Sequence, residues 1–390
     1  MKVLMYSHDS YGLGHLRRTL ALAEAFVERD PLNDVLILTG STVSGAYRMS
    51  KGIDILKLPS AIKLDNGRYE SSRMSVSFEL LRELRSGLIL SAAREFDPDV
   101  FVVDKAPLGM KGEVSDTLEF LREERPGTLT VLGLRDVMDD PERVREGWQR
   151  NRTLEAIEEL YDRIIVYGPR EVYDPLPLYG LSPEVLSRTD YVGYVGRTVL
   201  CPASELPFPP GYVLVTAGGG GDGLRIVESY LEGLREAEPG FDSIVVTGPL
   251  MEDADRRRVE ELAAGLRVRV LEFRTDMELL LSGAGAVVAM GGYNTTIELL
   301  ASGKPAVIVP RVEPRVEQLI RAERLSKLGL VKMIHPDDLG PRVLRSTVEG
   351  LLQRGASGDR RPAVDLSGAA RVIELVCRDV AEKHTVRLGA

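Results

Sequence analysis

Residues 289–318 read AMGGYNTTIELLASGKPAVIVPRVEPRVEQ, and this stretch joins a buried strand, a glycine turn and a helix that carries one acid. The helix is expected to begin after the glycine pair at 291–292, and a glycine-capped helix start attracts phosphate. Glu298, about one turn further in, can bind the two hydroxyls of a ribose. A second strand then brings residues 317–318 to the same edge. The stretch therefore predicts a nucleotide pocket.

Length and composition indicate a large soluble globular chain. Its 390 residues predict about two to three domains. No apolar run approaches the roughly 20 residues of a membrane helix, and the opening MKVLMYS is typical of a buried strand rather than a signal peptide. Two cysteines form neither a disulfide framework nor a zinc site, which favours a reducing cytoplasm. The net charge of -9 argues against nucleic acid as a partner.

Short β-rich runs alternate with helical patterns along the whole chain, as in parallel sheets with crossover helices. The order occurs twice. Runs at 3–7, 33–40, 100–104 and 129–134 have counterparts at 213–217, 242–248, 286–290 and 306–310. We therefore predict an α/β chain of two Rossmann-like, doubly wound parallel-sheet domains that face each other across a cleft.

The domain boundary is expected at PASELPFPPG, residues 202–211, because so much proline suits neither a helix nor a central strand. This predicts an N-terminal domain at 1–200, a linker at 201–211 and a C-terminal domain at 212–368. The remaining residues, 369–390, are expected to form a helix that crosses back to the first domain.

A second glycine turn, TAGGGGDG at residues 216–223, follows one strand and precedes a helical pattern. Backbone N–H groups in such a turn can hold a diphosphate. Tight strand-to-helix turns also need glycine in folds that bind nothing, so a structural role stays open. The turn lacks the Gly-Lys-Ser/Thr ending of a P-loop, and neither turn has a clean GxGxxG. Nucleotide hydrolysis and dinucleotide binding are therefore disfavoured.

The N-terminal turn contains Gly12 and Gly14, which permit close approach of a ligand, and places His15 at the start of the first helix. The positive end of the helix disfavours imidazolium, so a neutral base is expected at pH 7. Such a base can deprotonate an attacking hydroxyl. A local helix cap is the alternative, and His8 competes for the catalytic role.

Asp104 follows the buried strand 100–104 and is expected at the ligand edge, as a base or an acceptor ligand, with a structural role in the turn as the alternative. The Asp-Pro-Asp run at 97–99 precedes that strand and lies away from the ligand edge. We expect no metal.

These features resemble the MurG-like branch of glycosyltransferases with the two-domain GT-B fold, more closely in the C-terminal half. In that family a glycine turn holds the donor diphosphate, a loop led by phenylalanine meets uracil, and a glutamate binds ribose. The resemblance assigns to donor binding Arg197, Gly218, Gly219, Gly220, Gly221, Phe273, Arg274, Glu298, Glu317 and Gln318. It assigns Gly12 and Gly14 to an acceptor or phosphate loop and His15 to catalysis. The helix start after the glycine pair adds Gly292, Asn294 and Thr295 to the donor-binding candidates. Asp104 joins His15 as a catalytic candidate from its place at the strand end.

Several positions depart from the family pattern. A serine of the diphosphate turn is replaced by Gly220, the first of two paired glutamines by Glu317, and a following asparagine by Arg321. The donor sugar therefore stays open. The lipid-acceptor loops of MurG are not reproduced, so peptidoglycan synthesis is not inferred. The turn at 12–15 also resembles the GxGHxxR segment of a related UDP-sugar hydrolase.

The resemblance implies an inverting, metal-independent transferase that moves a sugar, an N-acetylhexosamine among the candidates, from a UDP-sugar to a hydroxyl acceptor, either lipid-linked or a saccharide. The UDP-sugar is a co-substrate and no cofactor is expected. The alternatives are a UDP-sugar hydrolase or epimerase and a non-catalytic nucleotide-sugar sensor. We expect a cytoplasmic protein. Residues 78–90 mix apolar and basic side chains, which suits either core packing or peripheral contact with the inner face of a membrane.

Overall fold

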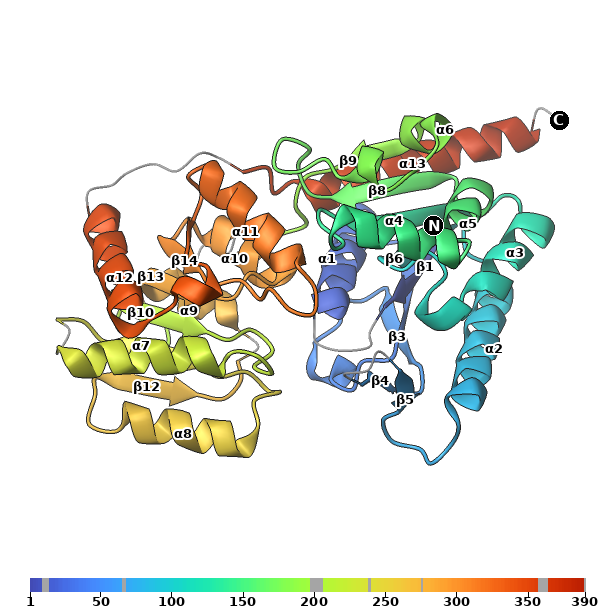
Figure 1. Ribbon diagram of the computed structural model, residues 1–390. Coiled ribbons are helices and arrows are strands. Elements are labelled where there is room, and N and C mark those ends of the chain that lie inside the picture. Colours follow the sequence, from blue (N-terminus) through green and yellow to red (C-terminus); the bar gives the residue numbers. More distant parts are fainter. Residues whose placement is uncertain are drawn as a thin grey trace. The chain divides into compact units, whose positions relative to one another are not determined.

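In a computed structural model the chain folds into two units (Figure 1). The first comprises Met1–Val195 and Asp365–Ala390, and the second comprises Gly196–Val364. The structure describes residues 1–8, 14–64, 68–196, 206–237, 240–274, 276–356 and 364–388. Each unit is a Rossmann-like α/β layer structure built on a parallel sheet, so the predicted α/β class with two Rossmann-like parallel-sheet domains is confirmed.

The sheet of the first unit has seven strands in the order β3-β2-β1-β6-β7-β8-β9, and every neighbouring pair is parallel. The bounds are β1 Lys2–Ser7, β2 Asp34–Thr39, β3 Ile53–Lys57, β6 Val100–Asp104, β7 Leu129–Arg135, β8 Arg163–Tyr167 and β9 Thr189–Tyr191. A separate antiparallel pair, β4 Ala61–Lys63 and β5 Tyr69–Ser71, is inserted after β3. The winding direction reverses between β1 and β6, which lie side by side in the sheet.

Helices cover both faces of this sheet (Figure 1), with α1 and α13 packed together and with α2, α3 and α5 in another contacting group. The bounds are α1 Gly14–Arg29, α2 Phe78–Phe96, α3 Ser115–Glu124, α4 Pro141–Arg150, α5 Thr153–Leu160, α6 Pro183–Ser187 and α13 Gly368–Leu388, with 3-10 turns η1 Ser44–Ala46, η2 Met110–Gly112 and η3 Leu176–Leu178. The strands are apolar on both sides because helices cover both.

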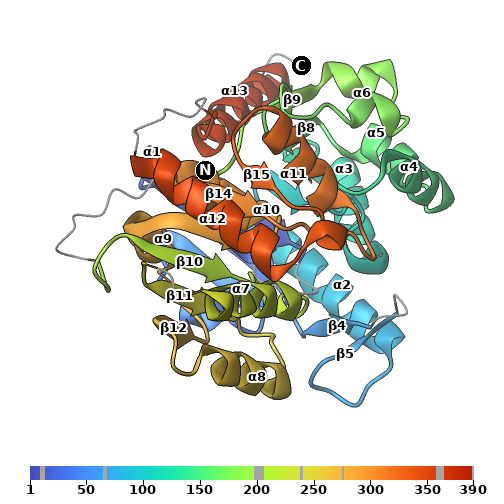
Figure 2. The ribbon, with the colours of Figure 1, turned by 60° about the vertical axis from the view of Figure 1, so that its left-hand side comes forward.

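The second unit repeats this plan with six parallel strands in the order β12-β11-β10-β13-β14-β15 (Figure 2), the strand order of dinucleotide-binding folds. The strands are β10 Tyr212–Thr216, β11 Ser243–Val246, β12 Val268–Leu271, β13 Ala284–Ala289, β14 Ala306–Ile308 and β15 Lys332–Met333. The helices are α7 Leu224–Glu236, α8 Asp253–Ala263, α9 Met277–Gly283, α10 Tyr293–Ser302, α11 Glu317–Lys327 and α12 Pro341–Ala356, with the 3-10 turn η5 Pro336–Asp338. The sequence analysis paired four strands of the first half with four of the second, and the members of each pair hold equivalent places in the two sheets.

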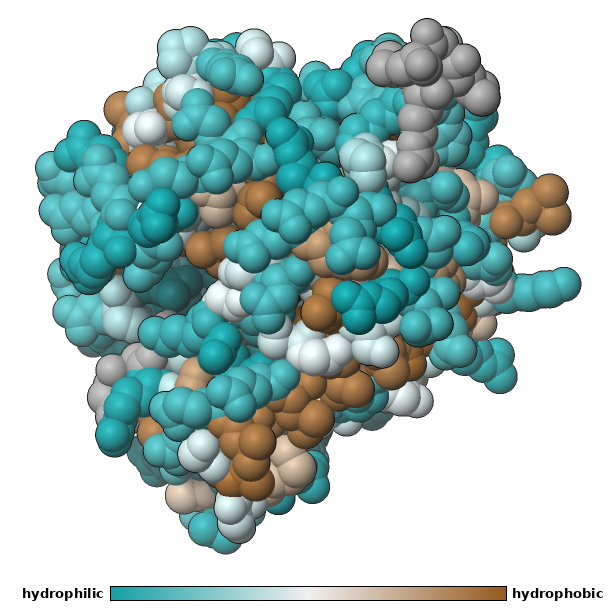
Figure 3. Space-filling model, turned by 90° about the vertical axis from the view of Figure 1, so that its right-hand side faces the viewer, coloured by the Kyte–Doolittle hydropathy of each residue, from teal (hydrophilic) through white to brown (hydrophobic). Residues whose placement is uncertain are grey.

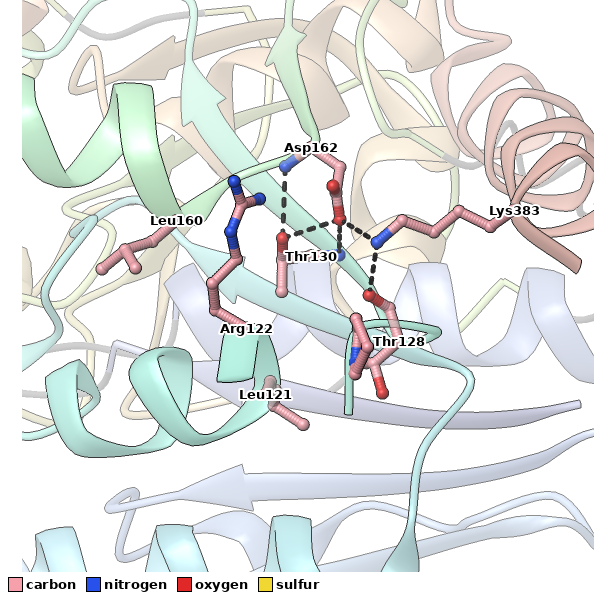
Figure 4. A pocket seen from close by; sticks show the side chains of 8 residues that line it. Leu121, Arg122, Thr128, Thr130, Leu160, Asp162 and Lys383 are labelled. Carbon is pink, nitrogen blue, oxygen red and sulfur yellow. Dashed lines mark hydrogen bonds and ion pairs between the residues drawn. The ribbon is translucent and has the colours of Figure 1, made fainter. Parts of the chain in front are cut away.

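The C-terminal helix α13 belongs to the first unit and is tied to its sheet. Lys383 Nζ donates to the Thr128 carbonyl oxygen at 2.8 Å and to Asp162 Oδ2 at 2.7 Å (Figure 4). Arg163 Nε donates to Asp379 Oδ2 at 2.6 Å. The small cavity beside Lys383 lies where β7 and β8 begin, at the opposite edge from their carboxyl ends.

Helix α2 buries only part of its apolar surface. Leu81 and Ile89 are fully buried, whereas Leu80 and Leu84 are 53% and 46% exposed. Apolar surface gathers on the side of the molecule where α2 lies (Figure 3). Core packing therefore accounts for some of these leucines and not for others. Among the described residues no helix is long and apolar enough to cross a membrane.

A buried ion pair holds the loop after β6 against α2. Arg85 donates to both carboxylate oxygens of Glu113, at 2.6 and 2.7 Å, and both side chains are fully buried. Arg85 also donates to the Pro59 carbonyl oxygen at 2.6 Å, and Tyr6 donates its hydroxyl to Glu113 at 2.6 Å. The loop between β6 and α3 is thus fixed by charge.

Replacing Glu113 with alanine is expected to lower the free energy of unfolding by about 3–5 kcal/mol, because Arg85 keeps its charge without its buried partner. Chemical denaturation followed by circular dichroism measures the change. Glu119, exposed on the following helix α3, supplies the control E119A, which should stay within about 0.5 kcal/mol of wild type. Equal effects of the two variants would contradict the importance of the pair.

Candidate functional site

In the first unit, candidate residues gather where the winding reverses. Ser7 ends β1 and Asp104 ends the neighbouring β6, and open α/β sheets bind ligands at the carboxyl ends of strands beside such a point. His8 follows β1, and Gly14 and His15 begin α1. Gly12 lies outside the described residues.

Asp104 holds two side chains of α1. Its Oδ2 is hydrogen-bonded to His15 Nδ1, and its Oδ1 accepts from Arg18 Nε at 3.0 Å. All three residues are at most 5% exposed. Because a carboxylate only accepts, Nδ1 of His15 carries the proton, and Nε2 is left as the basic atom. Asp104 therefore orients the histidine ring, whereas the sequence analysis expected a base or an acceptor ligand.

Arg135 contacts the other nitrogen of the same ring. It is the last residue of β7, and its Nη2 donates to His15 Nε2 at 2.7 Å. Sequence reasoning did not single out Arg135. Its position could have identified it, because Arg135 ends a buried strand two places from β1. The carboxyl ends of parallel strands all lie at one edge of the sheet.

His8 extends this cluster toward the interior. Its ring lies edge-on to that of His15, with 5.7 Å between centroids, and its Nδ1 is 3.4 Å from the Tyr6 hydroxyl. Tyr6 in turn donates to Glu113, the partner of Arg85. The two histidines are thus joined to the buried ion pair.

Both histidines are held neutral. Burial lowers the pKa of His15 well below 6.5, and the cations Arg135, Lys105 and Arg18 lower it further. Burial and Lys105 lower the pKa of His8 to about 3, against an opposing effect of Asp104. The neutral His15 expected from the helix dipole thus has burial as its main cause.

In the second unit the equivalent point lies between β10 and β13, where Thr216 pairs with Ala289. The glycine turn follows Thr216 and ends where α7 begins at Leu224. A Cβ built on Gly218 would lie 3.8 Å from Thr295 Oγ1 in the first turn of α10. The structure therefore brings the turn at 218–221 close to the helix start that follows Gly292.

Gly220 is required by the backbone of this turn. Its φ is +98°, and a Cβ there would meet the Thr247 carbonyl oxygen at 2.5 Å and the Met251 nitrogen at 2.9 Å. Leu250 N donates to the Gly219 carbonyl oxygen at 2.8 Å, which holds the turn against the loop after β11. Glycine rather than serine at position 220 thus has a steric reason.

The remaining donor-binding candidates lie on elements of this unit. Phe273 follows β12 and is 38% exposed, and Arg274 Nε donates to Asp276 Oδ1 at 2.7 Å. On α10, Asn294, Thr295 and Glu298 are each partly buried. Arg197 lies outside the described residues.

Glu317 and Gln318 are held by Arg311, which the sequence analysis did not single out. Arg311 Nη2 donates to Glu317 Oε1 at 2.7 Å, its Nη1 to Asp222 Oδ2 at 3.0 Å, and its backbone nitrogen to Gln318 Oε1 at 3.1 Å. Burial raises the pKa of Glu317, but Arg311 and Arg321 outweigh this and lower it below its usual value. Asp222 follows the glycine turn, so one arginine joins two predicted donor segments.

The described residues contain no group of three or more histidine, cysteine, aspartate or glutamate side chains placed to hold a metal ion. The cluster at β1 and β6 is one of histidines, cations and a single hydrogen-bonded carboxylate, which suits proton transfer better than metal binding.

Comparison with known proteins now adds to this geometry. Residues 213–375 match the glycosyltransferase family 28 C-terminal domain. The chain is also 30% identical, over 137 residues, to an uncharacterized glycosyltransferase of Methanopyrus kandleri. That match spans 35% of this chain and 37% of the relative's length.

Solved structures share the fold over nearly the whole chain. The glycosyltransferase of kitacinnamycin has a TM-score of 0.65 at 20% identity, over 97% of this chain and 99% of its own. TcCGT1 in complex with UDP has a TM-score of 0.65 at 16% identity, covering 98% and 99%. MurG of Acinetobacter baumannii has a TM-score of 0.59 at 15% identity, covering 97% and 99%. The chain therefore has the GT-B fold, and MurG is among its structural neighbours.

The lowered pKa of His15 predicts a pH dependence of stability. Below pH 6.5 the unfolded chain protonates this histidine while the native protein does not, so stability falls as the pH is lowered. Relative to H15Q, the free energy of unfolding of wild type should fall by about 1.4 kcal/mol per pH unit below about pH 6. Denaturant titrations at several pH values measure this. H384Q, which changes an exposed histidine, should parallel wild type, and an H15Q profile parallel to wild type would disprove the shift.

Proposed function

We propose that the protein is an inverting, metal-independent glycosyltransferase that moves a sugar from a UDP-sugar to a hydroxyl acceptor. The observation that carries this proposal is His15, held neutral by burial and oriented by Asp104 at the carboxyl edge of β1 and β6. The family 28 match of residues 213–375 supports a nucleotide-sugar donor, as does the fold shared with a protein solved with UDP.

In the proposed reaction, the acceptor oxygen attacks the anomeric carbon as the bond from that carbon to the UDP oxygen breaks. The proton of the acceptor hydroxyl passes to His15 Nε2, and the bonding electrons leave with UDP. Asp104 accepts a hydrogen bond from Nδ1 throughout and stabilises the imidazolium that forms, while Arg18 fixes the carboxylate. A single displacement of this kind inverts the configuration at the anomeric carbon.

The second unit is proposed to hold the donor. Backbone N–H groups of Gly219 and Gly221 would bind the diphosphate, because those of Gly218 and Gly220 already donate to Thr216 Oγ1 and to the Ala217 carbonyl oxygen. Arg197 would be a further ligand. Glu298 would bind the ribose hydroxyls, and the exposed Phe273 with Arg274 would meet the base. Glu317 and Gln318 would approach the sugar, and Arg311 keeps them beside the glycine turn. Gly292, Asn294 and Thr295 start the helix that carries Glu298.

The experiment is a panel of nucleotide sugars assayed for UDP release and acceptor glycosylation. H15A should lower kcat by about 10²–10⁴-fold with little change in UDP affinity. E298Q should instead raise KM for the donor by about tenfold or more with kcat nearly unchanged, because it weakens binding shared by ground and transition states. H384A is the control with an exposed histidine and should match wild type.

Other outcomes of this panel overturn the proposal. UDP and free sugar formed equally with and without any acceptor would indicate a hydrolase. A new sugar stereoisomer with UDP still attached would indicate an epimerase. Tight binding of a nucleotide sugar without turnover, and without effect of H15A, would indicate a sensor.

We also propose that the protein works on the cytoplasmic side of a membrane and touches it peripherally through α2, where Leu80 and Leu84 are exposed. Wild type should float with anionic vesicles, and the double variant L80E/L84E should bind them at least about tenfold more weakly, since each leucine contributes roughly 1.5–3 kcal/mol when buried. L328E changes an exposed leucine of the other unit and serves as the control. Absence of flotation by wild type would refute the contact.

A further inference from the structure

His8 stands at the end of a chain of hydrogen bonds that begins in the core of the first unit. Glu113 accepts from Arg85 and, at 2.6 Å, from the hydroxyl of Tyr6, so the single proton of that hydroxyl is used. The Tyr6 oxygen also accepts from the Met110 backbone nitrogen at 3.1 Å. Towards His8 Nδ1, 3.4 Å away, this oxygen can therefore only accept. The ring proton of His8 thus lies on Nδ1, and Nε2 is left as a hydrogen-bond acceptor.

The chain that sets this tautomer is enclosed. Tyr6 is 1% exposed and Glu113 is fully buried. Gly109, at a φ of +68°, brings the loop after β6 so close that a Cβ there would lie 3.2 Å from the Tyr6 hydroxyl oxygen. A buried polar network in which each member has its partners holds one arrangement. The tautomer of His8 is therefore selected by the protein core and not by solvent.

The other nitrogen of the His8 ring is open. Nδ1 faces Tyr6, two residues back on β1, and Nε2 points away from it. No described residue is hydrogen-bonded to Nε2, and His8 is partly exposed. His15 differs, because its two ring nitrogens are hydrogen-bonded to Asp104 and to Arg135. His8 thus offers an unfilled acceptor at the carboxyl edge of β1, where such sheets bind ligands.

The rings of His8 and His15 are close enough to contact one molecule. Their centroids are 5.7 Å apart, edge to face, and a hydrogen bond from a hydroxyl adds about 2.8–3.0 Å to the reach of each nitrogen. A hydroxyl has one proton, so the hydroxyl that gives its proton to His15 has none for His8. The pKa of His8 is lowered to about 3, so its Nε2 stays an acceptor and needs a second donor. A hydroxyl on a neighbouring carbon of the same molecule supplies one.

We infer that the acceptor is a polyol, the chemistry of a saccharide, in which a second hydroxyl beside the glycosylated one donates to His8 Nε2. This rests on the proposed function and names the acceptor class for the same site. His8 then binds the acceptor and selects for paired hydroxyls. Tyr6 is a positioning residue that acts through the tautomer of His8. A molecule with a single hydroxyl leaves Nε2 unfilled and is a poorer acceptor.

The first test follows the imidazole nitrogens of the whole protein by NMR at neutral pH, without donor. The chain has four histidines, and the signals lost in H8N assign His8. In wild type, Nδ1 of His8 should carry the proton and Nε2 should not. Y6F removes the hydroxyl that Nδ1 faces and should give a mixture of the two tautomers. Protonated Nε2 in wild type, or a single unchanged tautomer in Y6F, would overturn the inference.

The second test compares the vicinal cyclohexanediols with cyclohexanol, which lacks only the second hydroxyl. In wild type a diol should shift the Nε2 signal of His8 and bind about tenfold more tightly than cyclohexanol, because one hydrogen bond is added. H8Q keeps an acceptor oxygen near the place of Nε2 and should retain this preference, followed at the His15 ring. H8N has a shorter side chain and should lose it. H384Q, which changes an exposed histidine, should match wild type.

Denaturation midpoints show whether each variant remains folded. Equal binding of diol and cyclohexanol by wild type, or an undiminished preference in H8N, refutes the inference. Retention of the preference by H8Q separates loss of the acceptor atom from general damage to the site, which would affect H8Q and H8N alike.

The nucleotide-sugar panel supplies an independent readout. H8N should lower kcat/KM for a saccharide acceptor by about ten- to hundredfold, mainly by raising KM, and should leave UDP affinity unchanged. A protein that transfers sugar but shows no preference for paired hydroxyls would refute this inference alone. A protein that binds the diol at His8 but reacts with no UDP-sugar would refute the proposed function and, with it, the assignment of the diol site to an acceptor.

Discussion

The arrangement of the first unit depends on one carboxylate, Asp104, at the end of β6. Its two oxygens hold His15 and Arg18, one turn apart on α1, so the first helix is tied to the strand beside β1. Because Asp104 is buried, its carboxylate needs these two partners: a buried carboxylate without hydrogen bonds has a high free-energy cost. The same contact places the ring proton on Nδ1 of His15 and leaves Nε2 unprotonated, where it accepts a hydrogen bond from Arg135. Helix position, ring tautomer and basic atom therefore follow from a single interaction.

The second unit relies on backbone geometry where the first relies on charge. Gly220 lets the turn after β10 pack against the loop after β11, with no space for a side chain. Arg311 then joins the residue after this turn to the start of α11 through Asp222 and Glu317. The two units share a winding pattern. At the reversal point the first unit gathers histidines and cations around one carboxylate, and the second sets a glycine turn beside partly buried polar side chains of α10.

Much of the fold could be predicted because the buried parallel strands are apolar runs, and many of them are followed by glycine or an acidic residue. The runs at 3–7 and 213–217, and those at 100–104 and 286–290, hold equivalent places in the two sheets. Asp104 became a candidate because it ends a buried strand, and His15 because it starts the helix after the first strand, where such sheets bind ligands. Arg135 and Arg311 obey the same rule but were not recognised, because arginine at a strand end is common on solvated surfaces and no local pattern shows which partner it meets. The roles assigned to the donor residues remain predictions.

The sequence by itself determined the alternation of strands and helices, the repeated order and the glycine turns, because these depend on local periodicity and backbone freedom. Only the tertiary structure decided which charged groups meet. His15 and Asp104 are 89 residues apart, and His15 and Arg135 are 120 apart, so their contact depends on the order of strands in the sheet. Sheet order also decided that His15 is buried and neutral, because desolvation depends on everything packed around the ring and not on the residues beside it in the chain.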